Sequence, residues 1–287
     1  MARLHLYERK NHVGRLLDHQ RGGEMDYSKL HGRIQLGLIL TSLIGVAALG
    51  AIPDLDGTWA MLQVYPRIAV LPLVGESSQT SYVVQWVDVT QDGESLVMTD
   101  RYCFTVIEDT SILASTQIPD AFMAALRPTP RTGTLQETDG TITFEQPAYL
   151  EIRGAILENP ETDALPVDPE DPRVFDQDED DSPGMTVHVN LLGFIKAQIF
   201  VVQRVQYALS GYVVSEDRIE GSIEWSDEQV VLAATNPMLM ADSTGYPDPD
   251  LSKHIFLMIR AQEDWTCEWL KENWRVLFGL DDPDQDS

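Results

Sequence analysis

Carboxylates with the spacing of a cation-binding loop lie near the middle of the chain. Asp176, Asp178 and Asp180 occupy alternate positions inside segment 158–184, which holds eleven acidic residues, five prolines and one basic residue. A tight loop turns alternate side chains toward one point, and Ca²⁺ takes about six to eight oxygen ligands. The spacing therefore predicts a calcium site at these three residues. The alternative is an acidic segment that stays solvated and binds no ion.

The segment from Asp176 to Asp181 resembles the D-x-D-x-D calcium loops of EF-hands, dockerins and thrombospondin type 3 repeats. The resemblance implies direct binding of Ca²⁺ by the alternate carboxylates. The sixth position, which is Gly in those loops, is Asp181 here, and the twelfth, a bidentate Glu in EF-hands, is Val187. A complete EF-hand is therefore excluded. We expect a looser loop, and its remaining ligands would come from other acidic residues: Asp168, Asp171, Asp248 or Asp250.

The chain contains two cysteines, Cys103 and Cys267. In an oxidising compartment they would form a disulfide that closes a very long loop, which contributes about 2–5 kcal/mol to stability. The alternative is a pair of buried free thiols.

Motifs for known catalytic chemistry are missing from the sequence. It has no H-E-x-x-H zinc motif, no G-x-S-x-G nucleophile elbow and no glycine-rich phosphate loop. The only histidines after residue 51 are His188 and His254. An enzyme would require a cleft in which one of them meets a carboxylate. The sequence therefore favours a binding or structural protein over an enzyme and selects no catalytic residue.

The net charge of −26 bears on possible partners. Residues 51–287 hold 13 Lys plus Arg against 42 Asp plus Glu. Nucleic-acid backbones and anionic membrane surfaces are bound through basic patches that release counterions, and this chain has none. We therefore expect no nucleic-acid partner.

The elements that position these residues are expected to be strands. From Gly57 onward, short runs rich in Val, Ile, Tyr and Thr are separated by turn residues. The run 219–225 places Ile219, Ile223 and Trp225 on one face and two glutamates on the other. Such alternation predicts antiparallel strands with one buried face.

The turn residues predict hairpins, and hairpins predict an antiparallel meander. Asp92-Gly93 and Asp139-Gly140 each lie between strand-like runs. We count about ten strands, in the ranges 57–157 and 185–260, without the βα repeat of a parallel sheet. The prediction is an all-β antiparallel barrel or sandwich, and the barrel is favoured because closure removes exposed edges. A helix over 263–278 is expected to pack on it, and a short helix is expected over 119–126.

The opening of this β domain resembles that of lipocalin-type barrels. Gly57-Thr58-Trp59 matches the G-x-W that begins their first strand, and Arg260 ends a candidate last strand that precedes the helix. The resemblance implies that Arg260 stacks on Trp59 and closes the base of the barrel. The T-D-Y motif of that family is not found. Without the resemblance, Trp59 is an ordinary core residue at the start of a strand.

A lipocalin-like barrel implies an internal site for a small apolar ligand or lipid. Six aromatic residues on the expected strands are the candidates to line it: Trp86, Tyr102, Phe144, Tyr207, Tyr212 and Trp225. The alternative is a calcium-stabilised structural or interaction module without a cavity. In that case the tryptophan-rich C-terminal helix, with Trp265, Trp269 and Trp274, would dock a partner protein.

The N-terminal region predicts export. An uncharged and mostly apolar run, 34–52, follows Lys29 and Arg33. Met25 is a candidate true start, so the expected parts are an extension (1–24), a signal peptide or membrane anchor (25–51) and a β domain (52–287) with the acidic insertion. The predicted location is the bacterial periplasm or the exterior. The alternatives are an inner-membrane anchor over 34–52 and a buried core helix.

Overall fold

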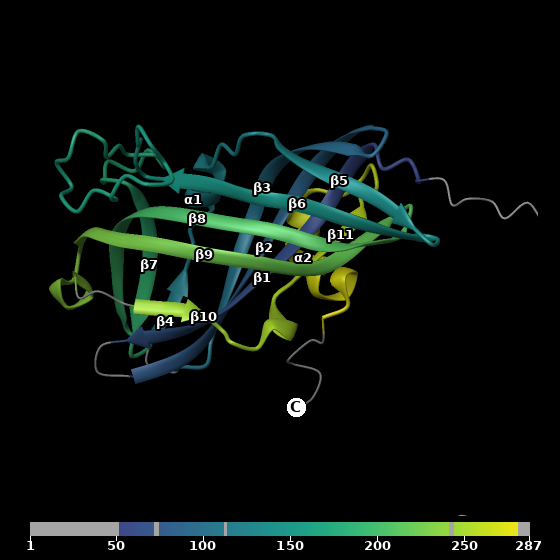
Figure 1. Cartoon of the computed structure of the whole chain (residues 1–287). Helices are drawn as coiled ribbons and strands as arrows, with labels where there is room; N and C mark the ends of the chain where they lie inside the picture. The colour runs from purple at the N-terminus through teal and green to yellow at the C-terminus, as the bar shows by residue number, and fades with distance from the viewer. Residues whose placement is uncertain (1–51, 72–74, 112–113, 241–243, 281–287) are drawn as a thin grey trace, which may run out of the picture. The chain divides into compact units, whose positions relative to one another are not determined.

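The computed structural model describes residues 52–71, 75–111, 114–240 and 244–280. More than half of this part is β-strand, as Figure 1 shows. The strands are β1 (Gly57–Leu71), β2 (Gly75–Asp92), β3 (Ser95–Asp109), β4 (Ala114–Gln117), β5 (Arg131–Thr138), β6 (Thr141–Arg153), β7 (Met185–Leu191), β8 (Ile195–Ser215), β9 (Arg218–Ala234), β10 (Thr244–Pro247) and β11 (Ile255–Arg260). The helices are α1 (Asp120–Ala125), α2 (Cys267–Phe278) and two 3-10 turns, η1 (Pro237–Met240) and η2 (Leu251–Lys253).

Eight of these strands form a closed ring in which every neighbouring pair is antiparallel. Its order is β1-β2-β3-β5-β6-β8-β9-β11, and β11 pairs again with β1. The closing pair sets Trp59 opposite Arg260. The predicted all-β class with a C-terminal helix is therefore confirmed, and between the barrel and the sandwich the chain adopts the barrel.

Hairpin turns join several neighbours in this ring, among them β2 with β3 and β5 with β6, as the turn residues predict. Gly93, between β2 and β3, has a φ of 61°. Asp139 and Gly140, between β5 and β6, have φ values of 53° and 81°. A tight hairpin requires such positive φ at its centre, and Gly, Asn and Asp tolerate it best.

One end of the barrel is widened by additional elements. β7 pairs with the first part of β8, β4 pairs with β7, and β10 pairs with the end of β1. Helix α1 packs between β3 and β7 (Figure 1). The sequence predicts this helix over 119–126. The observed helix is one residue shorter at each end, because Pro119 is its N-cap and Leu126 is its C-cap.

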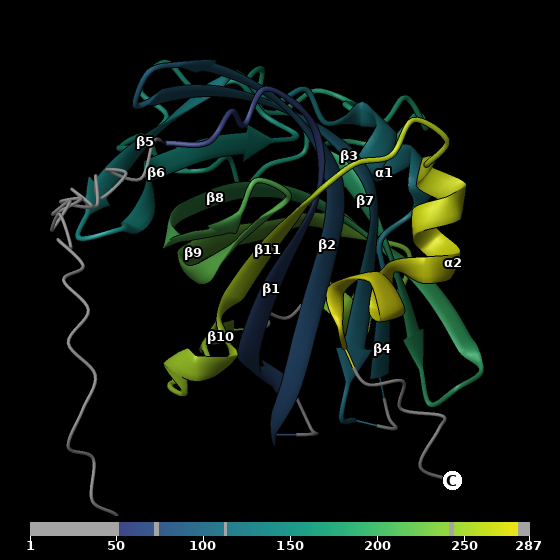
Figure 2. The ribbon, with the colours of Figure 1, turned by 90° about the vertical axis from the view of Figure 1, so that its right-hand side faces the viewer.

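Apolar residues form two large clusters on opposite sides of the barrel wall. The inner cluster fills one half of the barrel and includes Trp59, Met61, Phe144 and Phe256. The outer cluster lies under α2, whose buried face consists of Leu270, Trp274 and Phe278. Figure 2 shows α2 lying against the outside of β2 and β3. The inner core and the helix-covered face account for the two-sided burial of β1 and β2.

The acidic insertion is attached to the barrel by a few contacts. Leu165, together with Leu157 just before the insertion, is buried against Val202 of β8 and Leu232 of β9. Arg204 of β8 donates hydrogen bonds to the backbone oxygens of Pro160 and Asp163. The segment cannot form a core of its own, so its few apolar residues use the outer wall of the barrel.

The predicted extension (1–24) and the predicted signal peptide or anchor (25–51) lie outside the described residues. Within the part of the chain that the structure describes, no helix is long and apolar enough to cross a membrane.

Candidate functional site

A cavity of about 450 Å³ lies inside the widened half of the barrel. Pockets for small molecules commonly measure about 300–1,000 Å³. The inward side chains of β1 line it from Gln63 to Ala69, directly beyond the apolar core, and β2, β3, β8 and β9 contribute their own inward residues. The barrel is therefore filled by its side chains at one end and hollow at the other.

The lining of this cavity contains both apolar and polar side chains. The elements that widen the barrel contribute mainly apolar residues: Ile118, Phe122, Met123, Val187, Val189 and Leu239. The ring strands contribute further apolar residues and most of the polar ones, which include Tyr65, Arg67, Asp109, Arg153, Gln203 and Asp227. Such a mixed lining suits a molecule with an apolar body and a polar group.

The charged side chains that line the cavity are bonded to other protein groups. Arg67 of β1 forms an ion pair with Asp227 of β9, with 3.1 Å between Nη1 and Oδ2. Arg153 of β6 donates to Glu151, with 2.7 Å between Nη2 and Oε2. Asp109 accepts hydrogen bonds from the Gln79 side chain at 2.7 Å and from the Thr116 backbone at 3.2 Å.

Only two of the six predicted aromatic residues, Tyr102 and Trp225, line the cavity. Phe144 and Tyr207 are buried in the inner apolar core. Trp86 points out of the barrel into the cluster under α2.

The last of the six, Tyr212, is 56% exposed. It lies five positions after the inward Tyr207 on the same strand, and residues an odd number of positions apart on a regular strand face opposite sides. The structure therefore removes four of the six residues from the lining.

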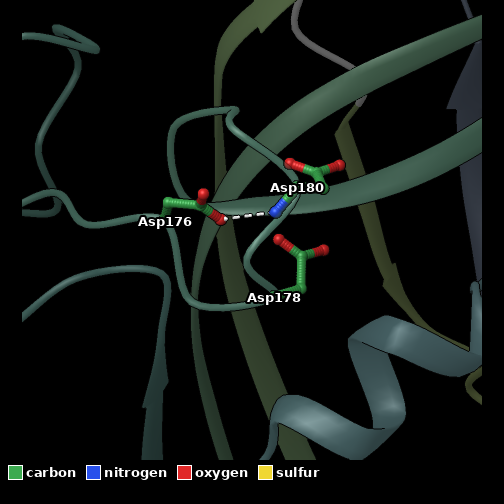
Figure 3. A group of neighbouring side chains, drawn as sticks. All are labelled: Asp176, Asp178 and Asp180. Atoms are coloured by element: carbon green, nitrogen blue, oxygen red, sulfur yellow. Dashed lines mark hydrogen bonds between the residues drawn. The ribbon is translucent and has the colours of Figure 1, made fainter.

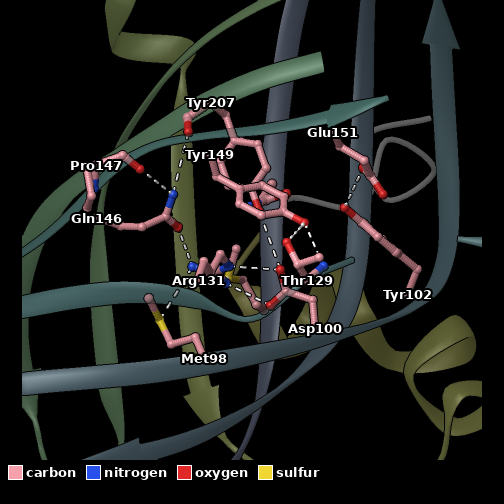
Figure 4. Close-up of polar contacts among 12 residues, drawn as sticks. Met98, Asp100, Tyr102, Thr129, Arg131, Gln146, Pro147, Tyr149, Glu151 and Tyr207 are labelled. Carbon is pink, nitrogen blue, oxygen red and sulfur yellow. Dashed lines mark hydrogen bonds and ion pairs between the residues drawn. The ribbon is translucent and has the colours of Figure 1, made fainter. Parts of the chain in front are cut away.

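A buried polar layer lies next to the apolar core inside the barrel (Figure 4). Arg131 of β5 and Asp100 of β3 form a two-pronged ion pair, both bonds measuring 2.8 Å, and their side chains are 2% and 1% exposed. Gln146 accepts a further bond from Arg131, and the Tyr207 hydroxyl donates to Asp100 at 3.3 Å. Burial raises the pKa of Tyr207, so this hydroxyl keeps its proton and remains a donor.

Beside this layer, Tyr102 connects the polar network to the cavity. Its hydroxyl donates to Glu151 at 3.3 Å, and the Arg153 guanidinium lies 5.8 Å from its ring centroid. Burial, followed by the negative charge of Glu151, raises the pKa of Tyr102 well above its ordinary value. Tyr102 is therefore a neutral hydroxyl held in place at the cavity wall.

The second lining aromatic, Trp225, is fixed by a histidine. Trp225 Nε1 donates to His254 Nδ1 at 3.0 Å, and His254 Nε2 lies 2.7 Å from the backbone oxygen of Asp248. Because Nδ1 accepts, the proton of the neutral ring is assigned to Nε2. His254 is 3% exposed and its two nitrogens bond an indole and a backbone carbonyl. The other candidate base, His188, lies on the exposed face of β7 beside Gln198.

The closed end of the barrel contains the pair implied by the lipocalin resemblance. The Arg260 guanidinium lies 4.6 Å from the ring centroid of Trp59. It also donates to the backbone oxygens of Asp54, Asp56 and Glu216. Arg260 thus joins the segment before β1, the β8–β9 turn and the Trp59 ring.

The predicted calcium ligands come together at the end of the acidic insertion (Figure 3). One carboxylate oxygen of each of Asp176, Asp178 and Asp180 lies within 4.8 Å of the others. Asp181, which stands where calcium loops have Gly, has a φ of 64° and so adopts the same left-handed turn. The Asp176 carboxylate accepts from the backbone nitrogens of Asp180 and Asp181 at 3.1 and 2.8 Å.

Asp178 is the most constrained of the three. Its Oδ2 accepts from the Thr186 backbone at 2.9 Å, whereas its Oδ1 is buried and has no hydrogen-bond partner among the described residues. Burial, with contributions from Asp180 and Asp176, raises the pKa of Asp178 above its ordinary value of 3.8. A cation would satisfy the buried oxygen and offset the repulsion. The four other acids considered as ligands have partners of their own. Asp171 pairs with Arg173 and Asp248 with Lys253, while Asp168 accepts from the Glu170 backbone and Asp250 from Ser252.

The C-terminal helix is attached to the barrel by a disulfide between Cys103 and Cys267. Trp274 is buried against Phe104 and Tyr82. Trp265 and Trp269 stack on each other with centroids 4.6 Å apart, and both remain partly exposed. Most of the tryptophan-rich segment therefore serves packing on the barrel.

Comparison of the chain with protein-family models, with curated proteins and with solved structures finds no match. The class of protein is therefore defined by the architecture alone: an eight-stranded antiparallel barrel with an internal cavity and an acidic loop that could hold a metal ion.

Sequence reasoning missed the charged residues of the cavity wall. The alternation that places Ile219, Ile223 and Trp225 on one face continues to Asp227, two residues later. On β1, the inward positions after Trp59 lead likewise to Arg67. Extending each alternating pattern past the last apolar residue would have identified both.

Proposed function

We propose that this protein binds a small amphipathic molecule inside its barrel. The observation that carries the proposal is the cavity itself, about 450 Å³ in volume and lined by both apolar and polar side chains. An interior filled by its own side chains, as the other half of this barrel is, would offer no such space. The eight-stranded ring and the stacking of Arg260 on Trp59 support a lipocalin-like ligand carrier.

The proposed location is the periplasm or the exterior of a bacterial cell. The disulfide supports it, because such bonds persist mainly in oxidising compartments. The apolar run at 34–52, preceded by basic residues, is the export signal that this location requires.

Ligand binding is tested with phenylnaphthylamine, a neutral dye whose fluorescence rises in apolar surroundings. We expect the wild-type protein to bind it saturably. Val205→Trp fills the cavity with an indole and should abolish binding, since Val205 lines it. Gln206→Trp is the matched control on the exposed face of the same strand and should bind as the wild type does. Binding that is equal in both variants would place the dye outside the barrel and refute the proposal.

A calcium ion in the acidic loop is the second proposed ligand. The unpartnered buried oxygen of Asp178 supports it, in addition to the convergence of three carboxylates. Ca²⁺ would stabilise the loop and, through the Asp178 bond to Thr186, the start of β7, whose Val187 lines the cavity.

The calcium proposal is tested by thermal unfolding with calcium, with magnesium and with a chelator. A saturating ligand at about 100 times its Kd stabilises the folded state by about 2.7 kcal/mol. We expect calcium to raise the melting temperature of the wild type and of Glu179→Gln, which removes one charge from the exposed neighbour. Asp178→Asn should not respond. An unchanged melting temperature of the wild type at millimolar calcium would refute the site.

A further inference from the structure

The charge pairing in the cavity wall points to the class of ligand. We infer that the cavity accepts an uncharged amphiphile with a hydrogen-bond-accepting oxygen and discriminates against ionised amphiphiles. This inference rests on the proposed function, because it concerns the occupant of the same cavity.

The first step is that both guanidinium groups of the lining already have carboxylate partners. Arg67 pairs with Asp227 and Arg153 with Glu151. The third carboxylate, that of Asp109, has both oxygens in hydrogen bonds to Gln79 and Thr116. An anionic ligand would therefore meet no unpaired cation in this wall, and a cationic one would meet only Asp109, whose two oxygens already accept hydrogen bonds.

The second step is the energetic consequence for a charged ligand. Moving an ionised group out of water without a partner is costly, whereas a neutral hydroxyl or ester loses much less. Competition for Arg67 would not help a carboxylate ligand, because its gain would leave the partly buried Asp227 without its own partner. The neutral form of an otherwise identical molecule should therefore bind more tightly.

The third step concerns the polar group of the ligand. Arg67 Nε is buried and has no hydrogen-bond partner among the described residues. Gly245 of β10 makes room for this side chain, because a Cβ at Gly245 would lie 2.5 Å from Arg67 Nη2. A neutral oxygen of the ligand would accept from a guanidinium N–H of Arg67 that the ion pair with Asp227 does not use, without disturbing that pair.

The experiment compares amphiphiles that share one chain and differ in their head group. Decanol and methyl decanoate are neutral, decanoate is anionic and decylamine is cationic at neutral pH. Each compound is titrated against the wild-type protein loaded with phenylnaphthylamine, at concentrations below those at which the compound forms micelles. The measured quantity is the concentration of the compound that displaces half of the dye. We expect the neutral compounds to displace the dye at concentrations lower by at least about tenfold.

Two variants test the cause of this preference. Asp227→Asn leaves Arg67 unpaired, so decanoate should gain at least about tenfold in affinity. Arg67→Met leaves Asp227 unpaired and should favour decylamine in the same way. Glu228→Gln is the matched control, since Glu228 lies next to Asp227 on the outer face and pairs with Arg204. It should keep the wild-type ranking.

The outcomes separate this inference from the proposed function. If decanoate or decylamine equals decanol in the wild type, the inference is wrong, while dye binding that is lost in Val205→Trp still supports the cavity. An unchanged ranking in both charge variants, each with its native circular dichroism spectrum, also overturns the inference. If one variant fails to fold, the wild-type ranking and the other variant decide. Absence of any dye binding by the wild type overturns both proposals.

Discussion

The buried ion pair between Arg131 and Asp100 offers a direct test of how this barrel is stabilised. Replacing Arg131 with Met keeps much of the side-chain volume but removes the partner of a carboxylate that is 1% exposed. Breaking a buried pair in this way costs about 3–5 kcal/mol, because the remaining charge stays uncompensated.

A matched control lies on the other face of the same strand. Arg101, which follows Asp100, pairs with Asp88 at 3.3 Å, and their side chains are 58% and 47% exposed. Arg101→Met should therefore cost about 0–1 kcal/mol, since solvent screens an exposed pair.

Equilibrium urea unfolding, followed by tryptophan fluorescence and far-ultraviolet circular dichroism, measures both changes. With an m-value of about 2 kcal/mol/M, the loss expected for Arg131→Met lowers the midpoint by roughly 2 M. The double variant with Asp100→Leu should recover much of this loss, because it removes the orphaned charge. Equal midpoints for Arg131→Met and Arg101→Met, or a double variant that is less stable than Arg131→Met, would refute the reasoning.

Three further predictions follow from contacts outside the cavity. Asp178→Asn should stabilise the calcium-free protein at neutral pH, because a carboxyl whose pKa is raised by folding destabilises the folded state when it is ionised. The advantage of the variant over the wild type should shrink as the pH falls through that pKa. A difference in unfolding free energy that is the same at neutral and at acidic pH would contradict this reasoning. Reducing the Cys103–Cys267 disulfide should lower the free energy of unfolding by about 2–5 kcal/mol, measured by urea titration with and without reductant, with the double Ser variant as an insensitive control. Arg260→Met should lower the free energy of unfolding by at least the worth of the cation–π contact with Trp59, about 0.5–2 kcal/mol, which appears as a lower melting temperature. An unchanged melting temperature would argue against a role of Arg260 in closing the barrel.

The fold could be predicted largely from local patterns. Alternation in 219–225 and the turns at Asp92-Gly93 and Asp139-Gly140 report short-range preferences of the backbone, which the barrel retains. The choice between barrel and sandwich could not be made in this way, because it depends on the pairing of β1 with β11 and of β6 with β8. Those pairings join distant parts of the chain and leave no signature in a single short run.

The site could be predicted only in part, because a residue's face depends on irregularities that the sequence does not mark. The β2–β3 ladder shifts register where Cys103 is left without an opposite residue, and the β6–β8 ladder shifts between Gln146 and Tyr149. Each shift changes which residues of the strand face inward. The convergence of Asp176, Asp178 and Asp180 could be predicted, because it depends on a short run of consecutive residues and not on strand register.

Two glycines at the base of the acidic insertion have a wider consequence. A Cβ on Gly154, at the end of β6, would lie 2.8 Å from the Cα of Gly184, just before β7, so the backbone returns to the point from which it left. The residues between them therefore form a side loop that the wall does not need for continuity. A lineage could lengthen, shorten or delete this loop, and with it any dependence on a cation, while every hydrogen-bonded ladder of the barrel kept its register.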